Sequence, residues 1–160
     1  MGANTSSSTR EVLDAVRRIV QTLHESSKSA ERLLGVSGAQ LFVLQRLAES
    51  PAASLNELAE RTHTHQSSVS AVVAKLVARD LVRRSRASGD GRRLELSVTP
   101  AGRRLVARAP HAAQDRLITA VNKLPLPRRA LLADALKDLA QAVAGVRRAE
   151  MFFEDEKDGK

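Results

Sequence analysis

The sequence predicts a mainly helical fold with one small β-hairpin, in the α+β class. Along most of the chain, apolar residues recur at spacings of three and four, which is the period of an amphipathic helix. Between residues 81 and 98 the period changes to two, and a segment rich in turn residues separates two short candidate strands. The chain has 160 residues, enough to bury one core, and it contains no cysteine for a disulfide or a thiol switch.

The N-terminal part is expected to consist of a disordered tail and a long helix. Residues 1–9 are small and polar, and they predict the disordered tail. One apolar stripe then predicts a helix within residues 10–36 that ends near Leu34, with Gly35 as its stop signal. A helix of this length at the end of a small domain is typical of dimerisation. Its stripe consists of Val12, Leu13, Val16, Ile19, Val20 and Leu23.

Two short helices are expected next, each with its own start signal. Ser37 is a suitable N-cap for a helix over residues 38–50, which the following proline ends. Ser54 and Glu57 have the spacing of a capping box. They predict a helix that reaches about Arg61.

A third helix is expected over residues 67–79, after a polar turn at residues 62–66. Apolar residues at helical spacing form one side of it and predict its buried face. The opposite face has small or hydrogen-bonding side chains, which is unusual for a helix face that only contacts water. This face consists of Gln66, Ser67, Ser70, Ala71 and Lys75.

The hairpin is expected to pair strands at residues 81–86 and 93–98 across the turn-rich residues 87–91. Thr99 is a suitable N-cap, and Pro100 a suitable first residue, for the helix that follows. We therefore expect the chain to return to helix directly after the second strand.

The C-terminal part is expected to be helical and to contribute to dimerisation over residues 101–150. The helix that opens after the hairpin is expected to continue to about Leu124, before two prolines interrupt it. A last helix follows over residues 128–148, and residues 151–160 form an acidic tail. The apolar stripe of the last helix consists of Leu131, Leu132, Ala135, Leu139 and Val143.

The excess positive charge lies in one segment. The formal net charge is +8, and residues 61–108 contain eleven Arg or Lys against three Asp or Glu, while the rest of the chain has fifteen of each sign. Such a segment is typical of a site for a polyanion, although a solvated basic surface has the same composition. With no Trp or Tyr and three Phe, the chain has few stacking platforms for single-stranded nucleic acid. Duplex DNA is therefore the favoured partner.

Helix, turn, helix and basic hairpin follow one another in the order of a winged helix-turn-helix, expected over residues 37–100. The second helix of such a pair fits the major groove, and the hairpin tip can place arginine in the minor groove. We therefore predict a DNA-binding domain between two dimerisation arms. The predicted DNA-binding residues are His65, Gln66, Ser67, Ser68, Ser70, Lys75, Arg83, Arg84, Arg86, Asp90, Arg92 and Arg93.

Some of these residues have an alternative role. Phosphate would repel Asp90, which we interpret as an orienting partner for an arginine such as Arg92. Gln66 and the serines near it can instead be capping residues. His63 and His65 make at most half of a zinc site, so phosphate contact is favoured over a metal at this turn.

The hairpin residues also resemble a known family, the MarR-type regulators. The similar residues are Asp90-Gly91-Arg92, Leu96, Val98-Thr99 and Gly102, which match the family's Asp-x-Arg followed by an apolar-Thr-x-x-Gly. Residues 67–70 and 76–82 look like the family's recognition helix and the strand after it. Asp80 stands where the family commonly has Gly, and Asp tolerates a left-handed helix end better than most residues.

The resemblance covers residues 10–148 in element order and implies a homodimer formed by the first and last helices. It also implies a palindromic operator, repression, and release by a small, often aromatic acid. His24, Phe42 and Arg46 are the candidate contacts of that acid, although Phe42 can equally be a core residue. The predicted function is sequence-specific regulation of transcription. The alternative is an architectural DNA-binding protein of the same fold without effector control.

Other classes of function have no support in the sequence. No Gly-rich phosphate loop, nucleophile elbow or set of metal ligands is present, so neither an enzyme nor a cofactor is expected. The first ten residues lack the apolar run of a signal peptide, and no stretch approaches the ~20 apolar residues of a membrane span. We therefore expect a cytoplasmic protein.

Overall fold

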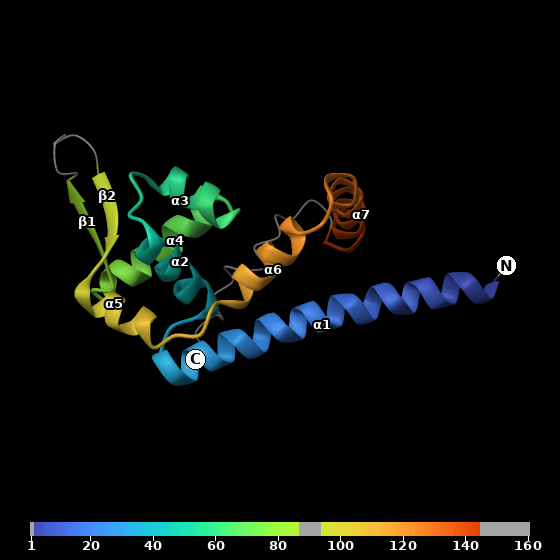
Figure 1. Ribbon diagram of the computed structural model, residues 1–160, viewed down its shortest axis with the longest axis horizontal. Coiled ribbons are helices and arrows are strands. Elements are labelled where there is room, and N and C mark those ends of the chain that lie inside the picture. The colour runs from blue at the N-terminus through green and yellow to red at the C-terminus, as the bar shows by residue number, and fades with distance from the viewer. Residues whose placement is uncertain (1, 87–93, 145–160) are drawn as a thin grey trace.

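The computed structural model describes residues 2–86 and 94–144, and within these ranges the chain forms seven α-helices and one two-stranded antiparallel sheet. This confirms the predicted fold class. Figure 1 shows a lobe that contains the hairpin and a set of short helices, with the two longest helices extending from it. The elements are α1 (Gly2–Leu34), α2 (Gly38–Glu49), α3 (Leu55–Thr62), α4 (Gln66–Ala78), β1 (Val82–Arg86), β2 (Leu94–Val98), α5 (Pro100–Ala107), α6 (Ala113–Asn122) and α7 (Leu126–Ala144).

Helix α1 begins at Gly2, so the disordered tail predicted over residues 1–9 is wrong for the residues described. Extending an existing helix adds one hydrogen bond for each residue fixed, which favours continuation of the helix predicted from residue 10. Near this end Ser7 Oγ donates to Glu11 Oε1 at 3.0 Å. At the other end Gly35 has φ +67°, and its N–H donates to the Glu31 carbonyl, as the stop signal predicted.

The start signals of α2 and α3 are confirmed, with one difference. Ser37 and Gln40 form a complete capping box at α2. At α3, Ser54 Oγ accepts from the Glu57 N–H at 3.1 Å, but the Glu57 carboxylate accepts from the Ala53 N–H and not from that of Ser54. The Glu57 carboxylate therefore bonds to the residue before the N-cap, whereas in a capping box it would bond to the N-cap residue itself.

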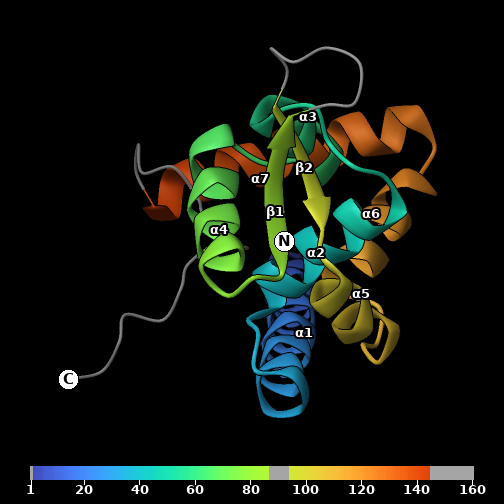
Figure 2. The same cartoon turned by 90° about the vertical axis from the view of Figure 1, so that its left-hand side faces the viewer.

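The core of the lobe lies around α2. Phe42, Leu44 and Leu47 of this helix are fully buried, as are Val69 and Val73 of α4. Figure 2 shows α2 behind the hairpin, with α4 and α5 on opposite sides of it. The apolar residues of α2, α3 and α4 and of the hairpin therefore form one core, and the hydrophobic burial of these side chains stabilises the lobe.

The hairpin is antiparallel, as predicted, with Val82 opposite Val98 and Arg84 opposite Leu96. A third chain segment joins its edge, because Ala52 and Leu96 exchange both backbone hydrogen bonds, at 3.0 and 2.8 Å. Asp80 has φ +53°, which is the left-handed turn expected at the start of the first strand. The hairpin is therefore fixed at its base to both α4 and the α2–α3 loop.

After the hairpin, the structure differs from the single helix predicted from residue 100 to about residue 124. Thr99 caps α5 as expected, accepting from the Gly102 N–H at 3.1 Å. The helix then ends at Ala107, and α6 begins only at Ala113. Pro110 lies in the connection; it lacks an N–H and disfavours helical conformation in the preceding residue, which explains the break.

Candidate nucleic-acid interface

The face of α4 that the sequence analysis described as small and hydrogen-bonding lies at the surface of the lobe. Gln66, Ser67, Ala71 and Lys75 are exposed, and Ser70 is half-buried beside them. Ala74 is also exposed and belongs to this face, although the sequence prediction missed it; its spacing of three from Ala71 was the available signal. Short side chains along an exposed helix allow a close approach of the backbone to a groove in DNA.

Ser68 is placed differently from the prediction. It is 5% exposed and lies on the buried side of α4, one position from the core residue Val69. A helix rotates by about 100° at each residue, and the side chain of Ser68 is turned from that of Ser67 toward the buried side of α4. The structure therefore does not place the side chain of Ser68 on the predicted contact face.

The N-terminus of α4 is open to the surface. His65 occupies the N-cap position, and its exposed side chain makes no capping hydrogen bond. His65 therefore contributes no side-chain cap to α4. The N–H groups at a helix N-terminus, together with the helix dipole, attract anions such as phosphate. The turn before α4 also contains His63, which is exposed and has φ +53°.

Two arginines of β1 extend the basic surface beyond α4. Arg83 and Arg84 are both exposed, and the Arg83 Nε donates to Ser97 Oγ at 3.1 Å across the hairpin. Successive side chains of a strand point to opposite faces, so the two arginines lie on different sides of the hairpin. Arg86 ends β1 opposite Leu94, and its side chain is outside those described. Asp90, Arg92 and Arg93 also lie outside the described residues.

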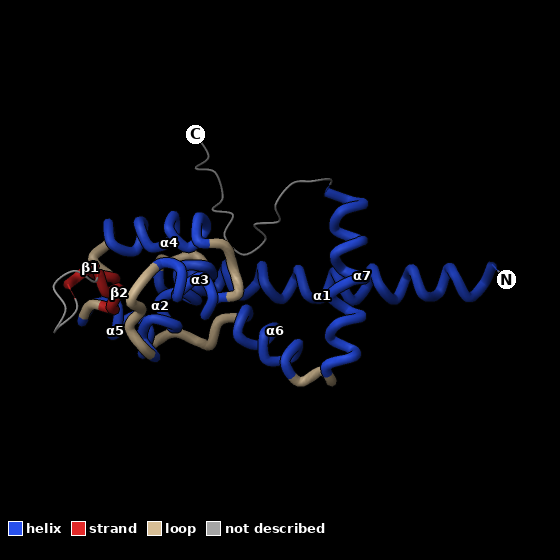
Figure 3. Tube along the Cα trace, turned by 90° about the horizontal axis from the view of Figure 1, so that it is seen from above, coloured by secondary structure: helices blue, strands red, loops and turns tan. Residues whose placement is uncertain are grey.

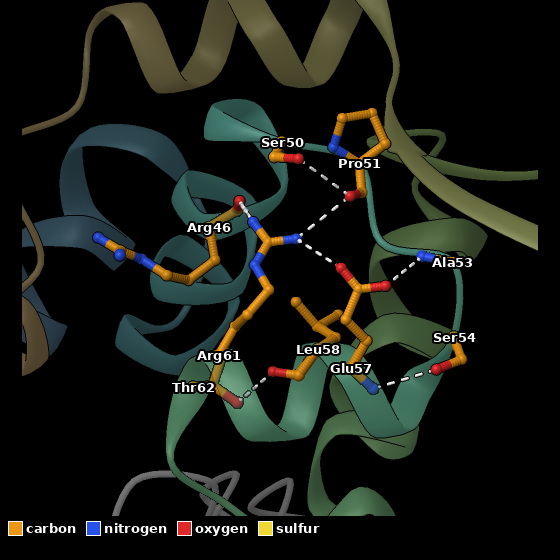
Figure 4. Close-up of polar contacts among 9 residues, drawn as sticks. All are labelled: Arg46, Ser50, Pro51, Ala53, Ser54, Glu57, Leu58, Arg61 and Thr62. Carbon is orange, nitrogen blue, oxygen red and sulfur yellow. Dashed lines mark hydrogen bonds and ion pairs between the residues drawn. The ribbon is translucent and has the colours of Figure 1, made fainter.

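Several arginines of the basic segment donate hydrogen bonds to backbone carbonyls of the protein itself. Figure 4 shows Arg61 donating to the carbonyl oxygens of Arg46 and Pro51, beside the Glu57 carboxylate at 3.8 Å. Arg79 donates to the Gly35 carbonyl at 2.5 Å, and Arg103 to the Val98 carbonyl at 3.0 Å. These guanidinium groups cap backbone carbonyls at the ends of α1, α2 and β2. Their charges add to the positive electrostatic potential of the lobe, but their side chains are held by hydrogen bonds within the protein.

The three candidate ligand residues do not form one open site in the chain. Phe42 is 1% exposed and is a core residue, which was the alternative interpretation. Arg46 is half-buried and paired with Asp115 and Glu49, with its guanidinium carbon 5.7 Å from the Phe42 ring centre. His24 is exposed on α1. A surface hollow of about 340 Å³ is lined by Glu25, Lys28, Glu31 and Arg32, none of which was predicted.

In residues 2–86 and 94–144, no group of three His, Asp or Glu side chains is arranged to hold a metal ion. None of the helices in these ranges has the length and apolar composition needed to cross a membrane.

Comparison with known proteins agrees with this geometry. Residues 34–93 match a family model described as MarR family. No curated protein is significantly similar in sequence to this chain. The matched residues run from the end of α1 through α4 and β1, and so include the whole outward face of α4.

Solved structures of regulators share the fold. The transcriptional regulator BldR from Sulfolobus solfataricus is 25% identical, with 88% of this chain and 99% of that chain covered and a TM-score of 0.53. A probable transcriptional regulator from Pseudomonas aeruginosa is 27% identical, with 82% and 95% covered and a TM-score of 0.51. Bordetella bronchiseptica BpsR, whose DNA binding is regulated by 6-hydroxynicotinic acid, is 23% identical, with 84% and 98% covered and a TM-score of 0.51.

The family model and the structures lead to the same assignment. The family model covers α2, α3, α4 and β1, and the solved regulators align with most of the chain. Residues 34–93 therefore resemble the MarR family, and the described chain has the fold of solved transcriptional regulators.

Proposed function

We propose that this protein is a homodimeric repressor that binds an inverted repeat in double-stranded DNA. The observation that carries the proposal is the outward face of α4, which is small and polar, is exposed along its length and has basic residues beside it. A helix of this kind enters the major groove, while the arginines of the hairpin contact the backbone and the minor groove. Such a protein acts where the DNA is, which is the cytoplasm in a prokaryote.

The exposed apolar residues of α1 and α7 support the dimer. They lie on helices that extend from the lobe, and Leu131 and Val143 remain 70% and 80% exposed in the single chain. Apolar stripes of this length are typical of an obligate interface, which would bury more than ~2,000 Å². The exposed set on these two helices is Val12, Leu13, Val16, Ile19, Leu33, Leu126, Leu131, Leu132, Leu136, Leu139 and Val143.

The role of α4 is tested by Ala71→Glu, which places a carboxylate in the middle of the outward face. We expect its affinity for a duplex site selected from random DNA to fall about tenfold to a hundredfold, the effect of ~1–3 kcal/mol at one contact. Ala107→Glu is the matched control, because it adds the same charge to the exposed side of α5. Fluorescence anisotropy titrations of both variants measure the effect; equal losses in the two would contradict a role for α4.

Sequence-specific regulation is distinguished from architectural binding by the footprint. A regulator protects one discrete inverted repeat, and its affinity there exceeds that for random duplex by at least about a thousandfold. A protein that coats all DNA with similar affinity would contradict the proposal. Repression itself is read from a reporter gene that carries the protected site.

We further infer that a small aromatic carboxylate weakens DNA binding, with Arg46 as its cationic contact. Because Asp115 and Glu49 already hold this guanidinium, the acid has to compete with a carboxylate of the chain. Salicylate and benzoate are therefore expected to raise the melting temperature of the wild type and to have a smaller effect on Arg46→Gln. If neither acid changes the thermal melt or the DNA titration, this part of the proposal is wrong.

A further inference from the structure

Two adjacent residues of α2 connect the lobe to α6. The side-chain amide of Gln45 donates to the Pro110 carbonyl at 2.8 Å and accepts from the Ala112 N–H at 3.0 Å. Gln45 is 8% exposed; its hydrogen bond from Ala112 is buried, and its hydrogen bond to Pro110 is partly buried. One amide therefore fixes the connection between α5 and α6 at two points.

The next residue holds α6 itself. Arg46 Nη2 lies 2.6 Å from Asp115 Oδ1, and these side chains are 26% and 18% exposed. The same Nη2 also lies 2.9 Å from Glu49 Oε1, within α2. Arg46 thus keeps a counterion on its own helix if the bond to Asp115 is lost. The Arg46–Asp115 pair is therefore suited to orient α6 against α2.

The arm beyond this point has few other attachments to the lobe. Helix α7 is exposed along nearly its whole length, and Figures 1 and 3 show it beyond α6, away from the hairpin and α4. Arg129 joins α7 to the end of α6, donating to the Asn122 carbonyl at 2.6 Å. Helix α6 packs against both α1 and α2, and the hydrogen bonds of Gln45 and Arg46 with α6 and the connection before it are made where α6 meets α2.

We propose that Gln45, Arg46 and Asp115 form a positioning latch that fixes α6 against α2 and thereby sets the distance between the two recognition helices of the dimer. This inference rests on the proposed function. In a two-fold dimer the arms are joined to each other, so any change of angle at the latch moves both lobes in opposite directions.

The dependence of DNA affinity on the spacing between half-sites measures how rigidly α6 is held against α2. Each base pair added between half-sites moves them by about 3.4 Å and rotates them by about 35° around the duplex. A dimer with rigid arms binds one spacing well and loses affinity at the others. A dimer with a loosened latch can follow the shifted half-site, and its preference among spacers becomes flatter.

The test uses the full-length dimer and duplexes that carry the selected inverted repeat with zero, one or two extra central base pairs. Asp115→Asn removes the charge from the α2–α6 pair, and Glu49→Gln removes the same charge from a pair that lies within α2. We expect Asp115→Asn to reduce the ratio of affinities between the selected and lengthened sites about fivefold, in the range of ordinary coupling between sites. Glu49→Gln is expected to keep the wild-type ratio.

A double-mutant cycle checks that the two residues act through each other. Arg46→Gln is expected to flatten the spacer profile as Asp115→Asn does, and the double variant to flatten it no further. Affinity for a single half-site is expected to stay at the wild-type level, because the outward face of α4 is unchanged. A general loss of stability would lower half-site affinity as well, and so is distinguished from loss of positioning.

Each outcome decides the proposal. A wild-type spacer profile in Asp115→Asn, with the dimer intact by light scattering, overturns the latch and leaves the proposed function standing. A wild type that has no preference for an inverted repeat contradicts the proposed function and the latch with it. If Asp115→Asn does not fold, Gln45→Glu tests the same connection, since it removes the donor to the Pro110 carbonyl and leaves the Arg46 pair in place.

Discussion

Replacing Gly102 by alanine is expected to destabilise the lobe by about 3 kcal/mol or more, at the upper end of what overpacking costs. A Cβ at this position would lie 2.3 Å from the Leu81 carbonyl oxygen and 2.6 Å from Val98 Cγ1. The Leu81 carbonyl cannot move away freely, because it accepts the Thr99 N–H at 3.0 Å. Both strands of the hairpin would have to shift relative to α5, and DNA affinity is expected to fall with the fold.

Urea denaturation of Gly102→Ala, followed by circular dichroism, measures this effect. Gly38→Ala provides the comparison, because its added Cβ would meet the Ser27 side chain and Cα at 3.2 to 3.3 Å, contacts that a small adjustment relieves. Its loss of stability is therefore expected to be clearly smaller. Equal midpoints for the two variants would show that the close approach of α5 to the hairpin is not a constraint.

The second large effect concerns the dimer. Leu136→Asp combined with Leu139→Asp places two carboxylates within the exposed apolar stripe of α7. If a second subunit covers this stripe, two charges would be buried without partners, and we expect the protein to become monomeric. Loss of the second binding module lowers affinity for the inverted repeat by about 10²- to 10⁴-fold.

Ala130→Asp combined with Gln141→Asp adds the same two charges to the opposite face of α7, where the helical period places these residues. This control is expected to remain dimeric and to keep its DNA affinity. Light scattering gives the mass of each variant, and anisotropy titration gives the affinity. A dimer that persists in the Leu136, Leu139 variant would show that α7 is not part of the interface.

Local features of the fold could be predicted from the sequence. Ser37, Gly35 and Thr99 act at helix ends as their residue types indicate, since a cap depends on atoms within four residues. The change of apolar period located the hairpin for the same reason. The break at Pro110 was missed, although proline gave the signal, because the apolar spacing continued on both sides of it.

Partners that are distant in the sequence could not be predicted. Arg79 meets a carbonyl 44 positions away, and Arg46 meets Asp115 across 69 positions. Composition counts all arginines of the basic segment equally, whereas only the fold separates Arg83 and Arg84, which are exposed on the hairpin, from those that cap helices.

The sequence by itself determined the fold class, the resemblance to the MarR family and the exposed polar face of α4, because each depends on local periodicity, capping and a short motif. Only the tertiary structure decided that Ser68 and Phe42 are buried, that Arg61 is committed to carbonyls, and that Arg46 holds α6. The physical reason is that a side chain's role depends on which other segment packs against it. That packing is fixed only when all the apolar faces are buried together in one core.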